Sequence, residues 1–349
     1  MDQHNQTDRT VYFDYLKVFA SFAVMILHIS AQNWYITDVN GSAWQIYNLF
    51  NSMVRWAVPV FVMISGALFL NRNITLKKIY SKYILRLVIA FAFWSLIYAI
   101  FINGSVANRI ESFIVGYYHM WFIMMIAGMY ACIPFIKPIA GKAGICIYFL
   151  VLSMLFSFVI PEFMTLANDF GNRAIIKGAD AIGQNLRNMN MYMVLGYTGY
   201  FVLGYYISNI SLRKILRILI YFLGICGFLS TAGLTLLVSL RNQNYCDHYY
   251  GYFTINVFLE ALAVFVWFKY RTFKREGINA FVGRLAKFSF GAYLIHVLVI
   301  EQLDLQLGLN TLSFHPAISI ICIGALTFII SFIASAILNQ IPYVNKLIV

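Results

Sequence analysis

The chain has 349 residues, of which 61% are hydrophobic, 17% aromatic and only 11% charged. Soluble domains carry about 25% charged residues, so this composition excludes an ordinary soluble enzyme, a disordered chain and a disulfide scaffold. The formal net charge is +12 at pH 7. In a soluble protein such an excess would favour nucleic-acid binding, but in a chain this apolar it bears first on membrane orientation. We therefore expect a polytopic membrane protein that contacts the lipid bilayer and no nucleic acid.

Ten apolar segments approach the length of about 20 residues that spans a bilayer. The short alternating segments typical of outer-membrane barrels are missing from the sequence, which favours helices. In chain order, the predicted spans cover approximately residues 11–31, 54–71, 84–102, 113–136, 143–160, 191–208, 215–238, 251–268, 288–302 and 317–338. We predict an all-α polytopic membrane protein with about ten transmembrane helices. No internal repeat or linker interrupts it, so residues 1–349 are expected to form a single integral-membrane domain.

The distribution of charge predicts the orientation of these helices. With the N-terminus inside, 18 of the 25 Lys and Arg residues fall in inner loops and six in outer loops. Because cytoplasmic loops are enriched in Lys and Arg, we expect both termini to be cytoplasmic. The longest outer loop, residues 161–190, is expected to form either an amphipathic helix or lid, or a solvated connector.

The first predicted span carries polar residues at helical spacing, namely Asp14, Lys17, Ser21 and His28. At about 100° per residue they fall on one side of a helix, with Lys17 and His28 about 16 Å apart along its axis. Ionisable groups in a membrane cost roughly 2.5–3.5 kcal/mol each, so this stripe indicates function. The structural alternative is an Asp14–Lys17 pair that anchors the helix end, with His28 as a hydrogen-bonded interfacial residue.

Other predicted spans carry further candidate residues for the same site: Arg55, Ser65, His119, Trp121, Glu260 and His296. Ser65 precedes Gly66, and such a small pair also suits close helix packing. Glu260 and His296 are equally well explained as hydrogen-bonded core residues. The adjacent residues Cys246, Asp247 and His248 are of metal-binding types, but three neighbours rarely converge on one ion, and we expect no metal.

These residues resemble motifs of the acyltransferase-3 family of integral-membrane acyltransferases, especially short members of the surface polysaccharide or enterobacterial common antigen O-acetyltransferase type. The matching pieces are Asp14-x-x-Lys17-x10-His28, Val58-Pro-Val-Phe61-x-x-x-Ser65-Gly66, His119-Met-Trp121-Phe122 and Ser289-Phe-Gly291-x-Tyr293-x-x-His296. Each motif is short, and their shared order over most of the chain carries the resemblance. Two departures are Lys17, where the family commonly has Arg, and the wide spacing of Lys82 and Arg86, where paired arginines are expected.

The resemblance implies transfer of an acyl group, most often acetyl from acetyl-CoA, to a sugar hydroxyl of a surface glycan or its lipid-linked precursor. It also implies a multi-pass protein of the bacterial cytoplasmic membrane, with acyl-CoA as a donor substrate and no permanently bound cofactor. The implied roles are catalysis by His28, Asp14 and Lys17, oxyanion or acceptor contacts from His119, Arg55, Ser65 and Trp121, acyl-CoA binding by Lys82, Arg86 and Lys78, and further polar contacts from Ser21, Glu260 and His296.

Two mechanisms and two other protein classes stay open at this point. His28 is expected to act as a general base, or alternatively to carry the acyl group itself. A transporter or flippase of a glycolipid or small anion would use the polar stripe as a path, but the paired helix interruptions typical of such proteins are not seen in the sequence. A sensor or assembly subunit would keep the fold without turnover.

Overall fold

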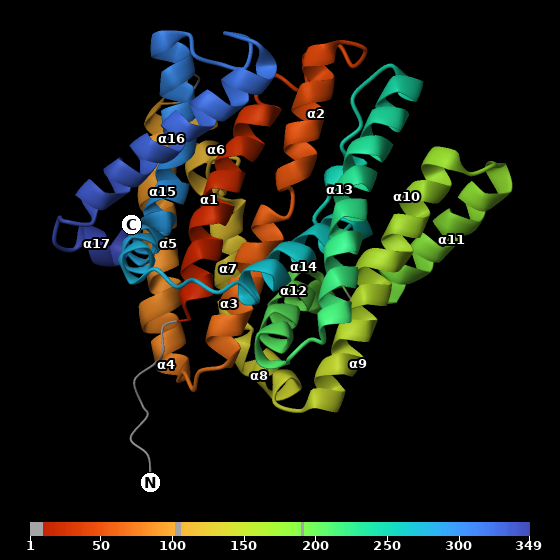
Figure 1. Ribbon diagram of the computed structural model, residues 1–349, viewed down its shortest axis with the longest axis horizontal. Coiled ribbons are helices and arrows are strands. Elements are labelled where there is room, and N and C mark those ends of the chain that lie inside the picture. The colour runs from red at the N-terminus through yellow and green to blue at the C-terminus, as the bar shows by residue number, and fades with distance from the viewer. Residues whose placement is uncertain (1–9, 102–105, 190–191) are drawn as a thin grey trace.

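A computed structural model describes residues 10–101, 106–189 and 192–349, and every regular element in these ranges is helical. Figure 1 shows the helices arranged around a central α1. The α-helices are α1 (Val11–Ala31), α2 (Ser42–Val54), α3 (Ala57–Leu70), α4 (Leu76–Lys78), α5 (Leu85–Phe101), α6 (Val106–Val115), α7 (Trp121–Ala131), α8 (Ile133–Ala140), α9 (Ala143–Ser153), α10 (Ile160–Phe170), α11 (Arg173–Met189), α12 (Tyr192–Asn209), α13 (Lys214–Asn242), α14 (Ile255–Lys269), α15 (Glu276–Leu307), α16 (Pro316–Leu338) and α17 (Val344–Leu347). Two π-helical turns, η1 (Ile79–Ile84) and η2 (Met154–Val159), and a 3₁₀ turn, η3 (His248–Tyr250), complete the set. The prediction of an all-helical membrane protein is confirmed.

The number of straight spans is smaller than the ten predicted. Within the described ranges, eight helical units are long and apolar enough to cross a membrane, and a ninth is counted if α7 and α8 form one bent span. These two helices meet at an angle of 63°, and Pro134 at the start of α8 lacks the N–H that would continue the helix. The predicted span 191–208 corresponds to α12, which is kinked at Gly196 and is not among the eight. Residues 102 and 191, two predicted span ends, lie outside the described residues, as do residues 1–9 at the N-terminus.

The second span begins earlier than predicted. It runs from Ser42 to Leu70 and consists of α2 and α3, which join at Arg55 and Trp56. Pro59 explains the break, because it has no N–H to donate to the carbonyl of Arg55 one turn earlier. The predicted span 54–71 places Arg55 at its outer end, whereas in the structure Arg55 lies inside the span. Asn48 and other polar residues of α2 interrupt the apolar pattern, so the sequence predicts no span before residue 54.

Helices α3 and α12 pack with their backbones in close approach. A Cβ atom at Gly66 would lie 1.8 Å from the carbonyl oxygen of Phe201, and one at Gly204 would lie 2.0 Å from that of Met63. Only glycine fits at these two positions, because any side chain would drive the helices apart. The role of Gly66 in close packing, which the sequence suggested, is therefore present in the fold.

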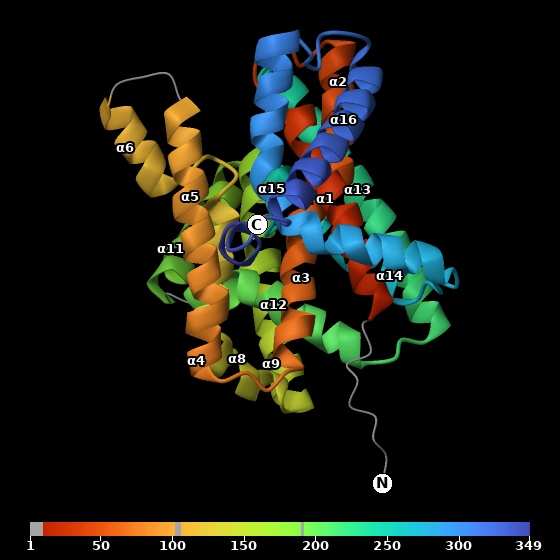
Figure 2. The same cartoon turned by 90° about the vertical axis from the view of Figure 1, so that its left-hand side faces the viewer.

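Helix α1 occupies the middle of the molecule and packs against α15, α16, α2 and α3. Its 21 residues place Asp14 in the first turn and His28 in the last, so the two side chains lie near opposite ends of a helix about 30 Å long. Figure 2 shows α1 and α15 side by side, with α5 on the other side of α15. This packing brings the end of α1 and the middle of α15 together.

The described part of the predicted loop 161–190, residues 161–189, is helical except at Gly171 and Asn172. Helix α10 extends to Phe170, and α11 follows as a second helix that packs against it. Figure 1 shows this hairpin at the edge of the molecule. The expected amphipathic helix is therefore present as α11, and many of its described residues are exposed.

Candidate active site

Three histidines from distant parts of the chain form a cluster. His28 lies in the last turn of α1, His119 just before α7, and His296 in the middle of α15. The ring centroid of His296 lies 5.1 Å from that of His28 and 5.2 Å from that of His119, while His28 and His119 are 6.5 Å apart. His119 and His296 are buried, and His28 is partly exposed. We call these three residues the histidine cluster.

A main-chain contact fixes the protonation of His296. Its Nδ1 lies 2.5 Å from the carbonyl oxygen of Tyr293. Because a carbonyl oxygen only accepts hydrogen bonds, Nδ1 carries the proton in the neutral ring. Nε2 then has a free lone pair and is a hydrogen-bond acceptor. This Nε2 is buried and has no hydrogen bond to a described residue, so it is available to hold a neighbouring imidazole N–H.

Helix α15 also positions His119. The hydroxyl of Tyr293 donates to the carbonyl oxygen of His119. The hydroxyl of Tyr98 donates to the carbonyl oxygen of Leu294 at 2.9 Å and accepts from the N–H of Leu298 at 3.1 Å, which joins α5 to the same turn of α15. The His119 ring interacts with the main chain of Leu294 but reaches ordinary hydrogen-bond geometry with no described residue. A buried imidazole of this kind is suited to donating to a bound substrate.

Arg55 lies within electrostatic range of His28. The carbon of its guanidinium stands 4.0 Å from the centroid of the Tyr250 ring, and its head group interacts with the hydroxyl of Tyr252. Trp121 stacks on the Tyr252 ring at 5.8 Å. Arg55 and Trp121 are thus both placed beside Tyr252.

The other polar residues of α1 lie toward its first turn. Asp14 is buried and precedes Lys17 by nearly one helical turn. The hydroxyl of Ser21 donates to the carbonyl oxygen of Lys17 at 2.9 Å. Ser21 is thereby occupied by its own helix, whereas Asp14 and Lys17 are placed at the opposite end of α1 from His28.

Ser65 is placed away from the histidine cluster. Its hydroxyl interacts with that of Tyr130 at the end of α7, and Tyr130 in turn acts electrostatically on Arg86. Ser65 lies ten residues beyond Arg55, which is about 15 Å along α3. The geometry therefore groups Ser65 with the candidate donor residues and not with Arg55 and His119.

Among the candidate donor residues, Arg86 is packed and the lysines are exposed. The Arg86 guanidinium donates to the main-chain oxygen of Val349 at 2.5 Å and lies 5.3 Å from the centroid of Phe290. Lys78 and Lys82 lie on the surface around η1. Of these three side chains, only that of Arg86 is packed inside the bundle, where it contacts Val349.

Glu260 belongs to a buried hydrogen-bond network and, like His28, lies within electrostatic range of Arg55. Its Oε1 accepts from the hydroxyl of Thr231 at 2.6 Å, and Asn256 donates to that hydroxyl at 2.7 Å. These contacts join α13 to α14, and Glu260 also lines an apolar cavity between them with Phe19 and Trp56. Its contacts are those of the hydrogen-bonded core residue that the sequence left as one alternative.

Two of the residues considered for metal binding, Cys246 and His248, come together with Asp169 and not with Asp247. Asp169, Cys246 and His248 each place one ligand atom within 4.8 Å of the others. The Asp169 carboxylate already accepts from the hydroxyl of Tyr249 at 2.7 Å, and burial raises the pKa of the Cys246 thiol. The contacts join the end of α10 to the loop before α14.

The structure adds residues that the sequence did not single out. The partly exposed ring of Tyr118 lies 5.4 Å from that of His28. Gln32, Glu301 and Asp304 lie on α1 and α15 beyond the histidines, at the same end of both helices. Gln32 follows His28 by four residues, so helical periodicity could have extended the polar stripe to it.

A comparison with protein families shows what the chain is similar to. A family model described as an acyltransferase domain, that of the acyltransferase-3 family, matches residues 10–336. The matched segment contains α1 through nearly all of α16, and with them the histidine cluster. Separate searches of curated proteins and of solved structures found no match.

Proposed function

Because the chain belongs to the acyltransferase-3 family and is a membrane acyltransferase, we propose that it moves an acetyl group from cytoplasmic acetyl-CoA to a sugar hydroxyl. The acceptor is a surface glycan or its lipid-linked precursor, and the membrane is the bacterial cytoplasmic membrane. The observation that carries this proposal is the histidine cluster at one end of α1. Its members come from three separate motifs of the sequence, which packing brings to one place.

In the proposed reaction His28 is the general base. It removes the proton of the acceptor hydroxyl as the hydroxyl oxygen attacks the thioester carbonyl. Collapse of the tetrahedral intermediate breaks the carbon–sulfur bond, and the proton on His28 passes to the departing CoA thiolate. The products are an O-acetyl ester and CoA, so no oxidant or other reactant is needed.

Two neighbours of His28 suit the oxyanion of this intermediate. Arg55 carries a fixed positive charge close to His28, and His119 has a buried ring that reaches hydrogen-bond geometry with no described residue. Preorganised donors of this kind stabilise a developing negative charge without reorganising. In this reaction the single N–H of neutral His28 turns toward the unpaired Nε2 of His296, so the other ring nitrogen of His28 stays unprotonated and acts as the base.

The opposite end of the molecule suits the donor. Arg86, near the start of α5, holds the main-chain oxygen of Val349 at 2.5 Å, and a phosphate group of CoA is a stronger acceptor for the same guanidinium. Lys78 and Lys82 add positive charge on the surface nearby. Asp14 and Lys17 in the first two turns of α1 then lie beside the path of the thioester arm toward His28.

The test compares matched histidine variants. Membranes containing the wild-type protein should release CoA from acetyl-CoA when a glycan acceptor is present, and His28→Ala should abolish this release. The control is His315→Ala, because His315 is exposed and its side chain makes no cap contact at the start of α16. Equal CoA release by His28→Ala and His315→Ala, at equal protein levels, would remove His28 from the reaction.

A further inference from the structure

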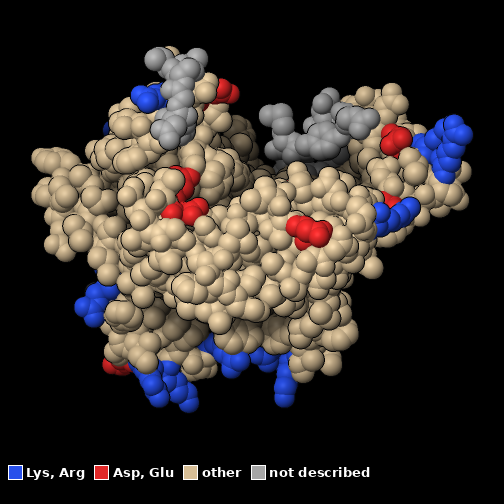
Figure 3. Space-filling view, turned by 90° about the horizontal axis from the view of Figure 1, so that it is seen from above, with Lys and Arg blue, Asp and Glu red and all other residues tan. Residues whose placement is uncertain are grey.

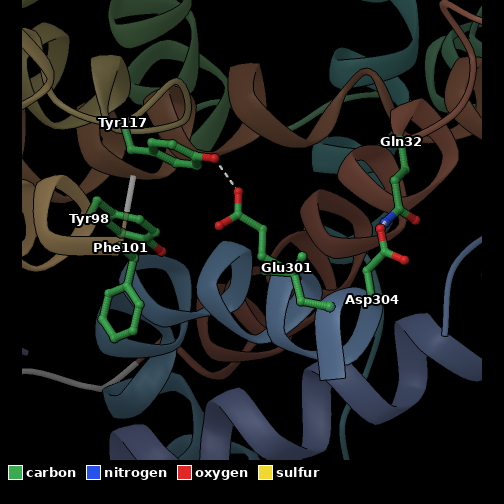
Figure 4. Close-up of a pocket in the computed structure, with 7 residues that line it drawn as sticks. Gln32, Tyr98, Phe101, Tyr117, Glu301 and Asp304 are labelled. Carbon is green, nitrogen blue, oxygen red and sulfur yellow. Dashed lines mark hydrogen bonds between the residues drawn. The ribbon is translucent and has the colours of Figure 1, made fainter. Parts of the chain in front are cut away.

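A cavity of about 440 Å³ opens beside the histidine cluster, between the ends of α1, α5 and α15. Figure 4 shows Tyr98, Phe101 and Tyr117 on one side of it, Gln32 and Asp304 on the other, and Glu301 between them. Its lining therefore combines three aromatic rings with two carboxylates. We call it the carboxylate pocket.

Aromatic rings connect the carboxylate pocket to the histidine cluster. Tyr98 and Tyr117 stack at 4.7 Å with an interplanar angle of 4°. The Tyr98 ring lies 5.1 Å from that of His119, and the Tyr117 ring lies 6.1 Å from it. A ligand in the pocket is thus one layer of side chains away from the proposed reacting centre.

The polar groups of the pocket accept hydrogen bonds more than they donate them. Tyr117 donates to Glu301, and burial together with this carboxylate raises the pKa of the Tyr117 hydroxyl. Asp304 accepts from Gln32 at 3.1 Å and from Asn310 at 2.8 Å. The Oε1 of Gln32 is buried and has no hydrogen bond to a described residue, so it is an unused acceptor in the pocket.

The charge of the pocket is negative throughout. Its described lining contains two carboxylates and no Lys or Arg, and both carboxylates lie near the C-terminal end of α15, where the helix dipole adds partial negative charge. Figure 3 shows that the face seen from above is largely uncharged, with most Lys and Arg side chains at its margins. An anion such as CoA or an acidic sugar would be repelled here.

We propose that the carboxylate pocket is the acceptor subsite and that Glu301 and Asp304 make it selective for neutral or amine-bearing sugars over acidic ones. Sugar hydroxyls and amines donate to carboxylates, and the apolar face of a sugar ring stacks on aromatic side chains. An acidic acceptor would place its own charge against two carboxylates, and such like-charge contacts exclude wrong partners. This assignment rests on the proposed acyl transfer to a sugar, which it deepens by naming the subsite and its charge preference.

The experiment uses the full-length protein in lipid nanodiscs with three acceptor probes: the methyl glycosides of glucose, glucosamine and glucuronic acid. CoA release from acetyl-CoA is measured at varied acceptor concentration, and binding of each glycoside is measured by thermal shift without donor. We expect the glucoside and glucosaminide to have a KM about tenfold or more below that of the glucuronide. The glycosides that are accepted should also raise the melting temperature.

Neutral variants then test the two carboxylates. Glu301→Gln and Asp304→Asn should each raise the KM of the accepted glycosides about tenfold, and the double variant should lose discrimination against the glucuronide. The KM for acetyl-CoA should stay unchanged in both. Glu276→Gln is the control, because Glu276 is exposed at the other end of the same helix.

The outcomes separate this inference from the proposed function. Wild-type transfer with the same KM values and the same charge preference in Glu301→Gln, Asp304→Asn and Glu276→Gln would overturn the pocket assignment and leave acyl transfer standing. Absence of CoA release with every acceptor would count against the proposed function. In that case the thermal shift of the wild-type protein tests the pocket. The pocket assignment is overturned if no glycoside raises the melting temperature, or if the glucuronide raises it most.

Discussion

The ring centroids of His28 and His296 lie 5.1 Å apart, although the two residues belong to the first and the second-last long helices of the chain. The contact exists because α1 packs along α15. His296 is fully buried and bonds through Nδ1 to the carbonyl oxygen of Tyr293. Its other nitrogen is thereby presented as an acceptor beside His28, and this arrangement gives His296 a positioning role in the proposed reaction.

Replacement of His296 should lower turnover without affecting donor binding. We expect His296→Ala to reduce kcat about a hundredfold, since a misplaced base loses most of its alignment with the acceptor hydroxyl. His296→Gln, whose amide oxygen can accept near the position of Nε2, should recover part of the loss. The measurement is CoA release under saturating acetyl-CoA. An unchanged kcat in His296→Ala, or a rise only in the KM for acetyl-CoA, would contradict the positioning role.

Arg86 should act on the donor and not on the acceptor. We expect Arg86→Ala to raise the KM for acetyl-CoA about tenfold or more, because a charge-assisted contact to phosphate is lost. The KM for the acceptor should not change. Arg284→Ala, which removes an exposed arginine from α15, serves as the control for general loss of positive charge. Equal KM values for acetyl-CoA in both variants would remove Arg86 from the donor site.

Arg55 should support the transition state. Removal of an oxyanion donor costs about 10²–10³ in kcat, and we expect a loss of this size in Arg55→Ala. Arg55→Lys should recover only part of it, because Lys keeps the charge but loses the planar group over Tyr250. Tyr250→Phe, which keeps the ring and loses the hydroxyl contact to Asn48, should retain more activity than Arg55→Ala. The reverse order of the Arg55→Ala and Tyr250→Phe activities would contradict this role.

Gly66 should be required for the packing of α3 against α12. A Cβ atom there would lie 1.8 Å from the carbonyl oxygen of Phe201, so Gly66→Ala should destabilise the fold by about 1–3 kcal/mol or more. Gly233→Ala in α13 is the matched control, since a Cβ atom there meets no atom of the described residues within 4 Å. Thermal unfolding in detergent compares the two variants. A melting temperature for Gly66→Ala that equals that of Gly233→Ala would refute the close approach.

The sequence predicted the helical class and the main catalytic candidates because both depend on local patterns. Apolar runs identify the helices, and the 3.6-residue period places Asp14, Lys17, Ser21 and His28 on one side of α1. The boundaries failed where polar and proline residues interrupt the pattern. Helix α2 carries buried polar side chains such as Asn48, so the apolar pattern predicts a span from residue 54 only, whereas the span begins at Ser42 and contains Arg55.

The partners of the candidate residues depend on packing and could not be predicted. Nothing in the sequence distinguishes His296, which joins the histidine cluster, from Glu260, which bonds to Thr231 in a buried hydrogen-bond network. Arg55 and Ser65 both belong to the predicted span 54–71, so nothing in the sequence separates them. In the structure they lie about 15 Å apart along the helix, and Ser65 interacts with Tyr130. The carboxylate pocket forms only where α1, α5 and α15 come together, so no single sequence motif could predict it.

The central claim is that the protein acylates a surface glycan with His28 as the general base. The most direct measurement is mass spectrometry of surface glycans from cells that lack the protein, complemented with the wild type, His28→Ala or His315→Ala at equal membrane levels. We predict that the wild type and His315→Ala add the mass of one acetyl group to a glycan repeat, and that His28→Ala does not. Glycans of identical mass in all four strains, or full acetylation with His28→Ala, would contradict the claim.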